Sequence, residues 1–256
     1  MTGFSFFGVG NLGANLVNSL ISAGYDLKYI YKKSSQTIFD NFIENDIRRI
    51  INGSDIIFVS TQESKIKGVA ELIAGTGDIS GKIFFHTSNS LTSEVLKPVR
   101  DRGGIVASFS PLQTFTGFKK GENLFRGITF LMEGDPEALK CAEEISSKLG
   151  AFTLKVDPDK KIFFHISAVI SSNLLNSLLR FAKVQLNKAG SGSDISILIP
   201  LIRETLVNIE KAGLSGALSG PVKRGETGIV EKHLDKLEGE ERQLYKILTD
   251  YLTGGG

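Results

Sequence analysis

The stretch Phe4-Ser5-Phe6-Phe7-Gly8-Val9-Gly10-Asn11-Leu12-Gly13 decides the fold of this chain. Its aromatic start is typical of a short buried strand, and Leu12, Leu16 and Leu20 then recur at helical spacing. The glycines match the pattern G-x-G-x-x-G, which is informative only where a strand leads into a helix. That context is present, so the sequence predicts a strand, a glycine turn and a helix that together bind a dinucleotide.

Each glycine of the turn has its own physical reason. Gly8 permits the tight turn, Gly10 lets the backbone approach a pyrophosphate, and Gly13 lets the helix pack closely on the strand. The N–H groups at the helix start and the helix dipole stabilise phosphate charge. We therefore predict cofactor contacts from six consecutive residues: Gly8, Val9, Gly10, Asn11, Leu12 and Gly13. A glycine turn that binds nothing is the open alternative.

The end of the second predicted strand, residues 27–31, indicates which dinucleotide binds. An NAD site carries Asp or Glu at this position, where the carboxylate bonds the ribose hydroxyls. This chain has Lys32, Lys33 and Ser34 instead, and cations with hydroxyls suit the 2′-phosphate of NADP. We predict NADP(H) in preference to NAD(H). Adjacent lysines are also common on ordinary surfaces, and that alternative stays open.

Strands and helices alternate over the first part of the chain. Further strands are predicted at residues 55–59, 82–86, 105–109, 129–132 and 151–156. Helices are predicted between them at residues 65–74, 92–102 and 135–149. This alternation is typical of an α/β fold with a doubly wound sheet, so residues 1–156 are expected to form a Rossmann-like dinucleotide-binding domain.

The pattern after Asp157 is helical throughout. One helix of unusual length is predicted at residues 158–188, and a second at 194–212, where Pro200 is expected to introduce a kink. A glycine-rich loop at 214–228 and helices at 227–237 and 240–252 follow. Residues 157–256 are therefore expected to form an all-helical substrate and dimerisation domain. The long helix is apolar on more than one face, which predicts a homodimer through this domain.

Composition excludes several other classes of protein. The 256 residues carry 30 Lys and Arg against 28 Asp and Glu, so the net charge of +2 is too small for a general nucleic-acid binder. A single cysteine forms no internal disulfide, and no Cys, His or carboxylate cluster has the spacing of a metal site. Uninterrupted apolar runs fall short of the ~20 residues that span a bilayer. Residues 1–11 lack the features of a signal peptide. We expect a cytoplasmic protein with no metal, membrane or nucleic-acid partner.

Several motifs together resemble one family. They are Gly8 to Gly13, His86-Thr87-Ser88, Ser110-Pro111-Leu112-Gln113-Thr114-Phe115, His165 with Ser172-Asn173, Pro200-Leu201-Ile202, and Ala217 to Glu226 followed by His233. This set is similar to Rossmann-like NADP-binding oxidoreductases with a carboxy-terminal helical domain of unknown function. They are distant relatives of pyrroline-5-carboxylate and ketopantoate reductases. The resemblance covers nearly the whole chain and implies the fold and the cofactor, but no particular substrate.

The chain departs from that family at a few positions. Ser110 stands where the family reads His before Pro-Leu-Gln-Thr-Phe, and Asn89 stands where a glycine is usual. In the late loop, Ser219 replaces a threonine and Glu226 an aspartate. The Ser110 change removes a proton donor. It therefore supports a second hypothesis, a non-catalytic NADP-binding regulatory or sensor protein.

Two pairs of polar residues are predicted to line the nicotinamide end of the site. Hydride transfer needs a dry cleft beyond the carboxyl ends of the strands and a group that supplies a proton. Thr61 with Gln62 and Thr87 with Ser88 each follow a predicted strand, so we expect all four to bind the cofactor. Hydroxyls that merely cap helices are the alternative.

The long helix carries the predicted catalytic group. At ~100° per residue, Lys161, His165, Ser172 and Asn176 form one polar stripe, with Asn173 beside it. His165 is the predicted proton donor because its ordinary pKa lies near 6.5. Lys161 is expected to bind a carboxylate or donate a proton, and Asn173 to orient the substrate. A packed His165 and a solvated Lys161 are the alternative.

The predicted substrate contacts are Gln113, Lys223 and Arg224. Lys223 and Arg224 lie in a glycine-rich loop that is suited to closing over an anion, although solvated surface charges would give the same sequence. The resulting prediction is an NADP(H)-dependent oxidoreductase that acts on a small, anionic keto or imino compound.

Overall fold

The computed structural model describes residues 2–32, 38–190, 192, 194–220 and 224–252. Contacts divide the chain into two compact units, residues 1–172 and 173–256. The division between the units after residue 172 falls later than the domain boundary predicted after residue 156. The predicted boundary between a dinucleotide-binding domain and a substrate and dimerisation domain stays a prediction. The two units are described separately below.

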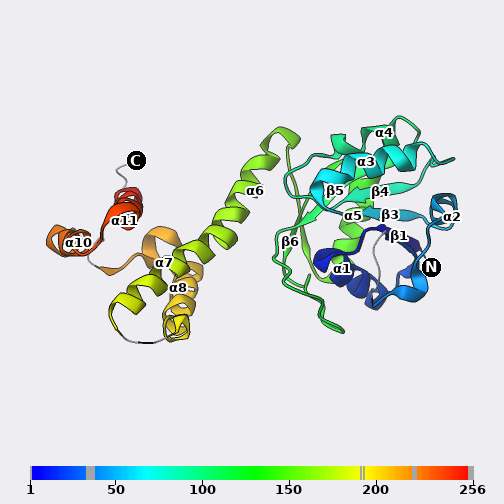
Figure 1. The fold of residues 1–256 in the computed structure, drawn as a ribbon. Helices are drawn as coiled ribbons and strands as arrows, with labels where there is room; N and C mark the ends of the chain where they lie inside the picture. The colour runs from blue at the N-terminus through cyan, green and yellow to red at the C-terminus, as the bar shows by residue number, and fades with distance from the viewer. Residues whose placement is uncertain (1, 33–37, 191, 193, 221–223, 253–256) are drawn as a thin grey trace. The chain divides into compact units, whose positions relative to one another are not determined.

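The first unit is built on a seven-stranded sheet with the order β2-β1-β3-β4-β5-β6-β7 (Figure 1). The strands are β1 (Gly3–Phe7), β2 (Asp26–Tyr31), β3 (Ile56–Val59), β4 (Ile83–His86), β5 (Ile105–Pro111), β6 (Thr129–Gly134) and β7 (Phe152–Lys155). The first five run parallel, β6 is antiparallel to β5, and β7 is parallel to β6. The predicted α/β class with a Rossmann-like sheet is confirmed.

Helices cover both faces of this sheet, with α3 and α4 on one side and α1 on the other (Figure 1). They are α1 (Asn11–Ser22) and α5 (Pro136–Leu149) on one face, and α2 (Ile47–Asn52), α3 (Glu63–Ala74) and α4 (Lys97–Arg100) on the other. Residues alternate between two apolar cores along each strand, so Phe6 packs with the α1 and α5 face while Phe7 packs with the α2 and α3 face. A doubly wound sheet follows from this two-sided burial.

A row of phenylalanine rings crosses the sheet on the α1 and α5 face. Neighbouring ring centroids lie 4.1–5.4 Å apart in the series Phe6, Phe58, Phe85, Phe109 and Phe130. All five side chains are fully buried. This continuous row of large aromatic surfaces packs β1, β3, β4, β5 and β6 together on one face of the sheet.

Two short segments differ from their predictions. Helix α2 was not predicted; its first turn is capped by Asp46, whose carboxylate accepts from the N–H of Arg48 at 2.9 Å. The helix predicted at residues 92–102 is a 3₁₀ turn, η2 (Ser93–Leu96), followed by the four residues of α4. Both segments are too short for an apolar period to develop in the sequence.

The predicted long helix is present but changes its winding. It runs from η3 (Pro158–Lys160) and α6 (Lys161–Val169) through a π-helical turn, η4 (Ile170–Leu174), into α7 (Leu175–Lys188). A π turn inserts one residue into the helical repeat. The single polar stripe predicted from Lys161 to Asn176 was therefore wrong beyond the π turn, because it assumed α spacing throughout.

The second unit is helical, as expected from its sequence. After η5 (Ile195–Leu198) it contains α8 (Ile199–Ala217), α10 (Thr227–Leu234) and α11 (Gly239–Leu252). The predicted kink at Pro200 was wrong, because this proline lies in the first turn of α8, where a missing N–H costs nothing. The non-helical residue of α8 is Gly213, with φ 69°.

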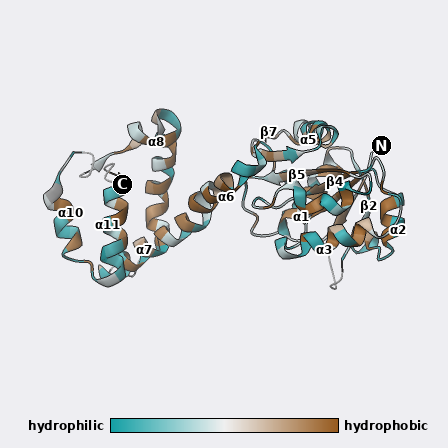
Figure 2. Cartoon of the chain, turned by 90° about the horizontal axis from the view of Figure 1, so that it is seen from above, coloured by the Kyte–Doolittle hydropathy of each residue, from teal (hydrophilic) through white to brown (hydrophobic). Residues whose placement is uncertain are grey.

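One helix of the described chain is long and apolar enough to cross a membrane. Residues Pro158–Lys188 contain an 18-residue window with mean hydropathy 1.5, none of it buried within the chain. The cartoon of Figure 2 is coloured hydrophobic over much of α6. The prediction from the sequence rested on uninterrupted apolar runs and therefore did not include this segment, because serines interrupt it. A mean hydropathy over 18 residues remains high despite those serines. A single such helix is weak evidence for a membrane span.

Candidate functional site

A cavity of about 520 Å³ lies at the carboxyl ends of β1, β3 and β4, within the first unit. Open sheets of this type bind ligands at this edge. The cavity is lined by Gly8, Val9, Gly10, Asn11, Leu12, Gly13, Lys32, Ser60, Thr61, Gln62, Glu63, Thr87 and Ser88. The structure thus brings together the predicted glycine turn, the predicted Lys32 and the four predicted polar residues after β3 and β4. Ser60 and Glu63 were not predicted.

The glycine turn has the geometry that pyrophosphate binding requires. Gly8 has a φ of 86°, and a Cβ on Gly13 would lie 3.0 Å from the Ser60 hydroxyl, so neither position accepts a side chain without strain. A Cβ on Gly10 would meet nothing within 4 Å. No side chain caps the start of α1, so its first N–H groups point into the cavity without a side-chain partner. These features fit a dinucleotide phosphate.

Asparagines of α1 anchor the segment that follows β5. The Asn11 amide donates to the Phe115 carbonyl at 3.1 Å, and the buried Asn15 amide donates to the Gly117 carbonyl at 2.8 Å. Gln113, a predicted substrate contact, is exposed, does not line the cavity and accepts a hydrogen bond from the Thr114 N–H at 2.8 Å. Its substrate role stays a prediction.

The strand order gives the cavity two distinct ends. Because β2 lies on one side of β1 while β3 and β4 lie on the other, Lys32 marks one end and Thr87 with Ser88 the other. Among the described lining residues, the end at Lys32 has no carboxylate. Lys33 and Ser34, predicted beside it, lie outside the described residues.

Glu63 is a pocket residue that sequence reasoning missed. It lies in the first turn of α3, and the Ser88 hydroxyl donates to its carboxylate at 2.6 Å. Hydrogen bonds from Ser88 and Ser90 lower the pKa of Glu63, and the charges of His165 and Lys161 lower it further. Acidic residues are common in the first turn of a helix, so the sequence around Glu63 did not indicate a site residue.

His165 lies close enough to interact with this corner. Its charge acts on the carboxylate of Glu63, which lines the cavity. The imidazole is partly exposed on α6, in the first unit. Its catalytic role stays a prediction.

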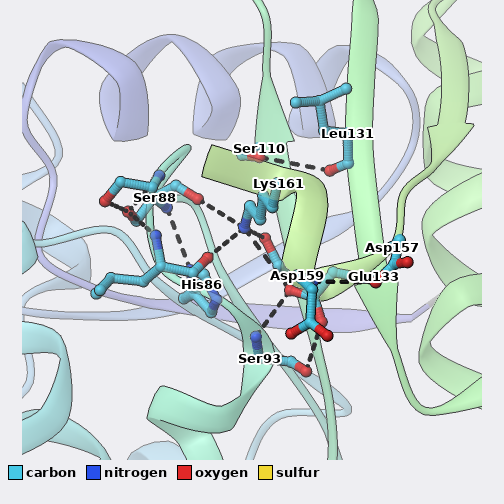
Figure 3. A network of polar contacts seen from close by, with 12 residues as sticks. His86, Ser88, Ser93, Ser110, Leu131, Glu133, Asp157, Asp159 and Lys161 are labelled. Carbon is cyan, nitrogen blue, oxygen red and sulfur yellow. Dashed lines mark hydrogen bonds and ion pairs between the residues drawn. The ribbon is translucent and has the colours of Figure 1, made fainter. Parts of the chain in front are cut away.

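Lys161, predicted as a second catalytic group, is fully buried and does not line the cavity. Figure 3 shows its side chain directed inward from the start of α6. The ammonium donates to the carbonyl oxygen of Ser88 at 3.1 Å and also to the Leu91 carbonyl and the Ser108 hydroxyl. It lies 3.7 Å from the buried carboxylate of Glu133. Burial lowers the pKa of Lys161 to about 8, although the negative charge of Glu133 opposes this shift.

The carboxylate of Glu133 is held in turn by Ser93. The N–H and the hydroxyl of Ser93 each donate to one carboxylate oxygen at 2.7 Å. Glu133 comes from β6 and Ser93 from η2, so this network joins segments that are far apart in the sequence. A buried charge pair whose polar atoms are hydrogen-bonded is tolerated where an isolated one is not.

Two further polar residues of the sequence motifs are buried in the sheet. Burial, followed by the nearby charge of Lys161, lowers the pKa of His86 to about 3, so its imidazole is neutral. Ser110 is fully buried, and its hydroxyl donates to the Leu131 carbonyl at 3.5 Å. Neither residue lines the cavity.

The remaining predicted residues belong to the second unit. Asn173 is exposed. The Arg224 guanidinium donates to the Glu226 carboxylate at 3.1 Å. The cation that was predicted to bind an anionic substrate is therefore paired with a carboxylate of the chain. Lys223 lies outside the described residues. The roles of all three stay predictions.

The strand, the uncapped glycine turn and the cavity across three strand ends define a dinucleotide-binding protein of the Rossmann type. Residues 128–252 match the family model described as "Domain of unknown function (DUF2520)". The predicted resemblance to Rossmann-like NADP-binding proteins with a carboxy-terminal domain of unknown function is confirmed. The sequence matches no curated protein.

Solved structures share the fold over the whole chain. A protein from Bacteroides fragilis described as a "putative NADP oxidoreductase" is 22% identical, with a TM-score of 0.80 and coverage of 99% of this chain and 98% of that one. Protein TM1727 from Thermotoga maritima is 25% identical, with a TM-score of 0.73 and coverage of 97% and 96%. A reductive aminase from Aspergillus terreus in complex with NADPH and ethyl levulinate is 14% identical, with a TM-score of 0.72 and coverage of 100% and 95%. The chain therefore has the fold of NADP-dependent reductases.

Proposed function

We propose that the protein is an NADP(H)-dependent oxidoreductase that acts on a small keto or imino compound. The observation that carries this proposal is the open, uncapped glycine turn, which leads on one side to Lys32 and on the other to Ser88 and Glu63. The reductive aminase bound to NADPH, together with an imine reductase from Streptomyces aurantiacus, supports this class of reaction.

We propose a place in the cavity for each part of the cofactor. The amides of Gly8 to Gly13 bind the pyrophosphate, and Lys32, with the predicted Lys33 and Ser34, binds the 2′-phosphate. Thr61, Gln62, Thr87 and Ser88 surround the nicotinamide half. When bound, the cofactor supplies or accepts a hydride.

His165 is the proposed proton donor to the substrate. It is partly exposed, whereas Lys161 and His86 are buried and do not line the cavity. Asn173 and Gln113 are proposed to orient the substrate, and Lys223 with Arg224 to bind its anionic group. His165→Ala is expected to lower turnover at least ~100-fold while leaving NADPH affinity nearly unchanged. Unaltered turnover would remove His165 from this role.

Two measurements test the cofactor and the reaction. Fluorescence titration with NADPH and NADH should show tighter binding of NADPH, and tighter NADH binding would contradict the proposed role of Lys32. A screen of NADPH oxidation over keto acids, cyclic imines and aldehydes should then identify the substrate class. A neutral or cationic substrate would contradict the proposed binding of an anionic group by Lys223 and Arg224.

The second candidate is a non-catalytic NADP-binding regulatory or sensor protein. Ser110 supports it, because the family that the sequence resembles reads His at this position and a serine hydroxyl does not ionise near neutral pH as an imidazole does. This candidate predicts NADPH binding without NADPH oxidation by any compound of the screen. Turnover of any of them would exclude it.

We further propose a cytoplasmic homodimer that forms through the long helix. Its apolar side chains at every fourth position are 41–54% exposed: Ile162, Ile166, Ile170, Leu174 and Leu178. Apolar surface exposed along a helix of this length requires cover in water, and a second copy of the helix supplies it. Light scattering at micromolar concentration should give twice the mass of the chain. A monomeric mass would contradict the proposal.

A further inference from the structure

Among the described lysines and arginines, Lys161 alone is buried. Transferring an ammonium out of water is costly, and well-packed apolar residues often replace a buried ion pair without loss of stability. Stability alone therefore does not explain a lysine here. Its contacts indicate what the charge is used for.

The ammonium has three protons and three neutral acceptors. These are the Ser88 carbonyl, the Leu91 carbonyl and the Ser108 hydroxyl, with the Glu133 carboxylate 3.7 Å away (Figure 3). An ammonium carries three N–H donors. All of them are directed to the protein, so the protonated side chain has no proton aimed at a ligand.

Two of these acceptors are main-chain carbonyls of a single turn, residues 88–91, which follows β4. The turn is also braced from within, because the N–H groups of Ser90 and Leu91 donate to the Ser88 hydroxyl oxygen at 3.2 and 3.1 Å. The same hydroxyl donates its own proton to Glu63 at 2.6 Å. Lys161 thus holds the buried side of a turn whose other side lines the cavity at Ser88.

We propose that Lys161 is a positioning residue whose buried ammonium holds the turn at residues 88–91 and so shapes the nicotinamide end of the cavity. Glu133, fixed by Ser93, compensates the charge and keeps the ammonium in place. This role replaces direct proton donation by Lys161. It rests on the proposed function, because it assigns the Ser88 end of the cavity to the nicotinamide half of NADP(H).

The test separates the two ends of the cavity by using two ligands. NADPH occupies the whole proposed site, whereas adenosine 2′,5′-bisphosphate carries only the adenine half and its 2′-phosphate. The variant is Lys161→Met combined with Glu133→Gln, so that no uncompensated charge is buried and Ser93 keeps an acceptor. Calorimetry on the full chain should show NADPH binding weakened about tenfold or more and adenosine 2′,5′-bisphosphate binding changed less than twofold.

Two control variants isolate the turn from general damage to the core. Lys82→Met removes another lysine that donates to a main-chain carbonyl, that of Ser54 at 2.8 Å, at the opposite end of β4. It should change neither affinity. Ser108→Ala removes one acceptor but leaves both carbonyl contacts of Lys161, and it should weaken NADPH binding less than threefold.

The outcomes distinguish the inference from the proposed function. If the double variant weakens both ligands equally, or weakens neither, Lys161 does not position the nicotinamide end and the inference is overturned. An effect of Ser108→Ala as large as that of the double variant would also overturn it. If the wild-type protein binds neither ligand, the proposed function fails and the inference falls with it.

Discussion

The two ends of the cavity are built in different ways. The end at the glycine turn consists mainly of main-chain groups from six consecutive residues, Gly8 to Gly13, with Lys32 added just after β2. The end at Ser88 is assembled from side chains of α3, the turn after β4, β5, β6 and α6. The comparison teaches that a local motif can present phosphate-binding amides by itself, whereas a polar wall for a reacting group needs a tertiary network.

The largest expected effect is on the assembled end. Lys161→Met alone leaves the carboxylate of Glu133 buried without its counter-charge, so the free energy of unfolding should fall by about 3–5 kcal/mol. Adding Glu133→Gln should recover part of this loss. Urea denaturation measures both values. A loss below 1 kcal/mol in the single variant would show that the pair is not isolated from water.

The pH dependence of stability sharpens the same comparison. Burial holds the pKa of Lys161 near 8 in the folded chain, below its ordinary value of 10.5. Folding therefore disfavours protonation of Lys161, so this residue should contribute a rise of about 3 kcal/mol to the free energy of unfolding as the pH increases from 8 to 10.5. Cys141 and Tyr25, whose pKa values burial raises to about 12, act in the opposite direction in the same window. Glu133, Glu63 and His86 are the titratable groups that face Lys161.

The control for this pH effect is the variant with Lys161→Met and Glu133→Gln. Other groups titrate equally in both proteins, so the difference between their pH profiles isolates Lys161. Parallel profiles for the wild type and the variant between pH 8 and 10 would contradict the expected shift.

At the glycine turn, the expected effect is on binding and not on folding. Gly10 has a φ of −80°, which any residue adopts, and its Cβ position is open. Gly10→Val should therefore leave the melting temperature within about 2 °C but weaken NADPH and adenosine 2′,5′-bisphosphate about 100-fold, because the side chain occupies the phosphate site. Gly13→Val is the matched comparison. Its Cβ meets Ser60 at 3.0 Å, so this variant should also unfold more easily. Unchanged binding by Gly10→Val would show that the phosphate does not bind at this turn.

The smallest expected effect concerns the 2′-phosphate. Lys32→Ala removes one charge-assisted hydrogen bond, so NADPH affinity should fall about tenfold while NADH affinity stays within twofold. Fluorescence titration of both cofactors checks this. An equal loss for both would show that Lys32 acts on a part that the two cofactors share.

Much of the fold could be predicted because its signals are local. The strand at Phe4 to Phe7, the glycine turn and the apolar period from Leu12 to Leu20 each lie within a few residues, and the alternation of elements predicts a doubly wound sheet. Short helices such as α2 escaped prediction because six residues do not complete two turns of a period. The antiparallel placement of β6 has no local signal, since strand direction is set by the connection across the sheet.

Prediction of the candidate site divided in the same way. Lys32, Thr61 and Ser88 were found because each follows a strand directly, and such positions collect at one edge of the sheet. Glu63 was missed because a carboxylate at a helix start is ordinary in sequence. Lys161 was expected to contact a ligand, whereas in the structure it pairs with Glu133. The two residues are 28 positions apart, so no local sequence pattern reveals this pairing.

The sequence by itself determined the class of fold, the glycine turn and the side of the sheet that binds, because these depend on backbone freedom and on apolar periods within single elements. Only the tertiary structure decided that Lys161 is buried beneath the turn at residues 88–91, that Glu63 lines the cavity, and that the long helix shifts its winding at Ile170–Leu174. The physical reason is that a charged side chain takes its role from the atoms around it. Those atoms come from segments that only folding brings together.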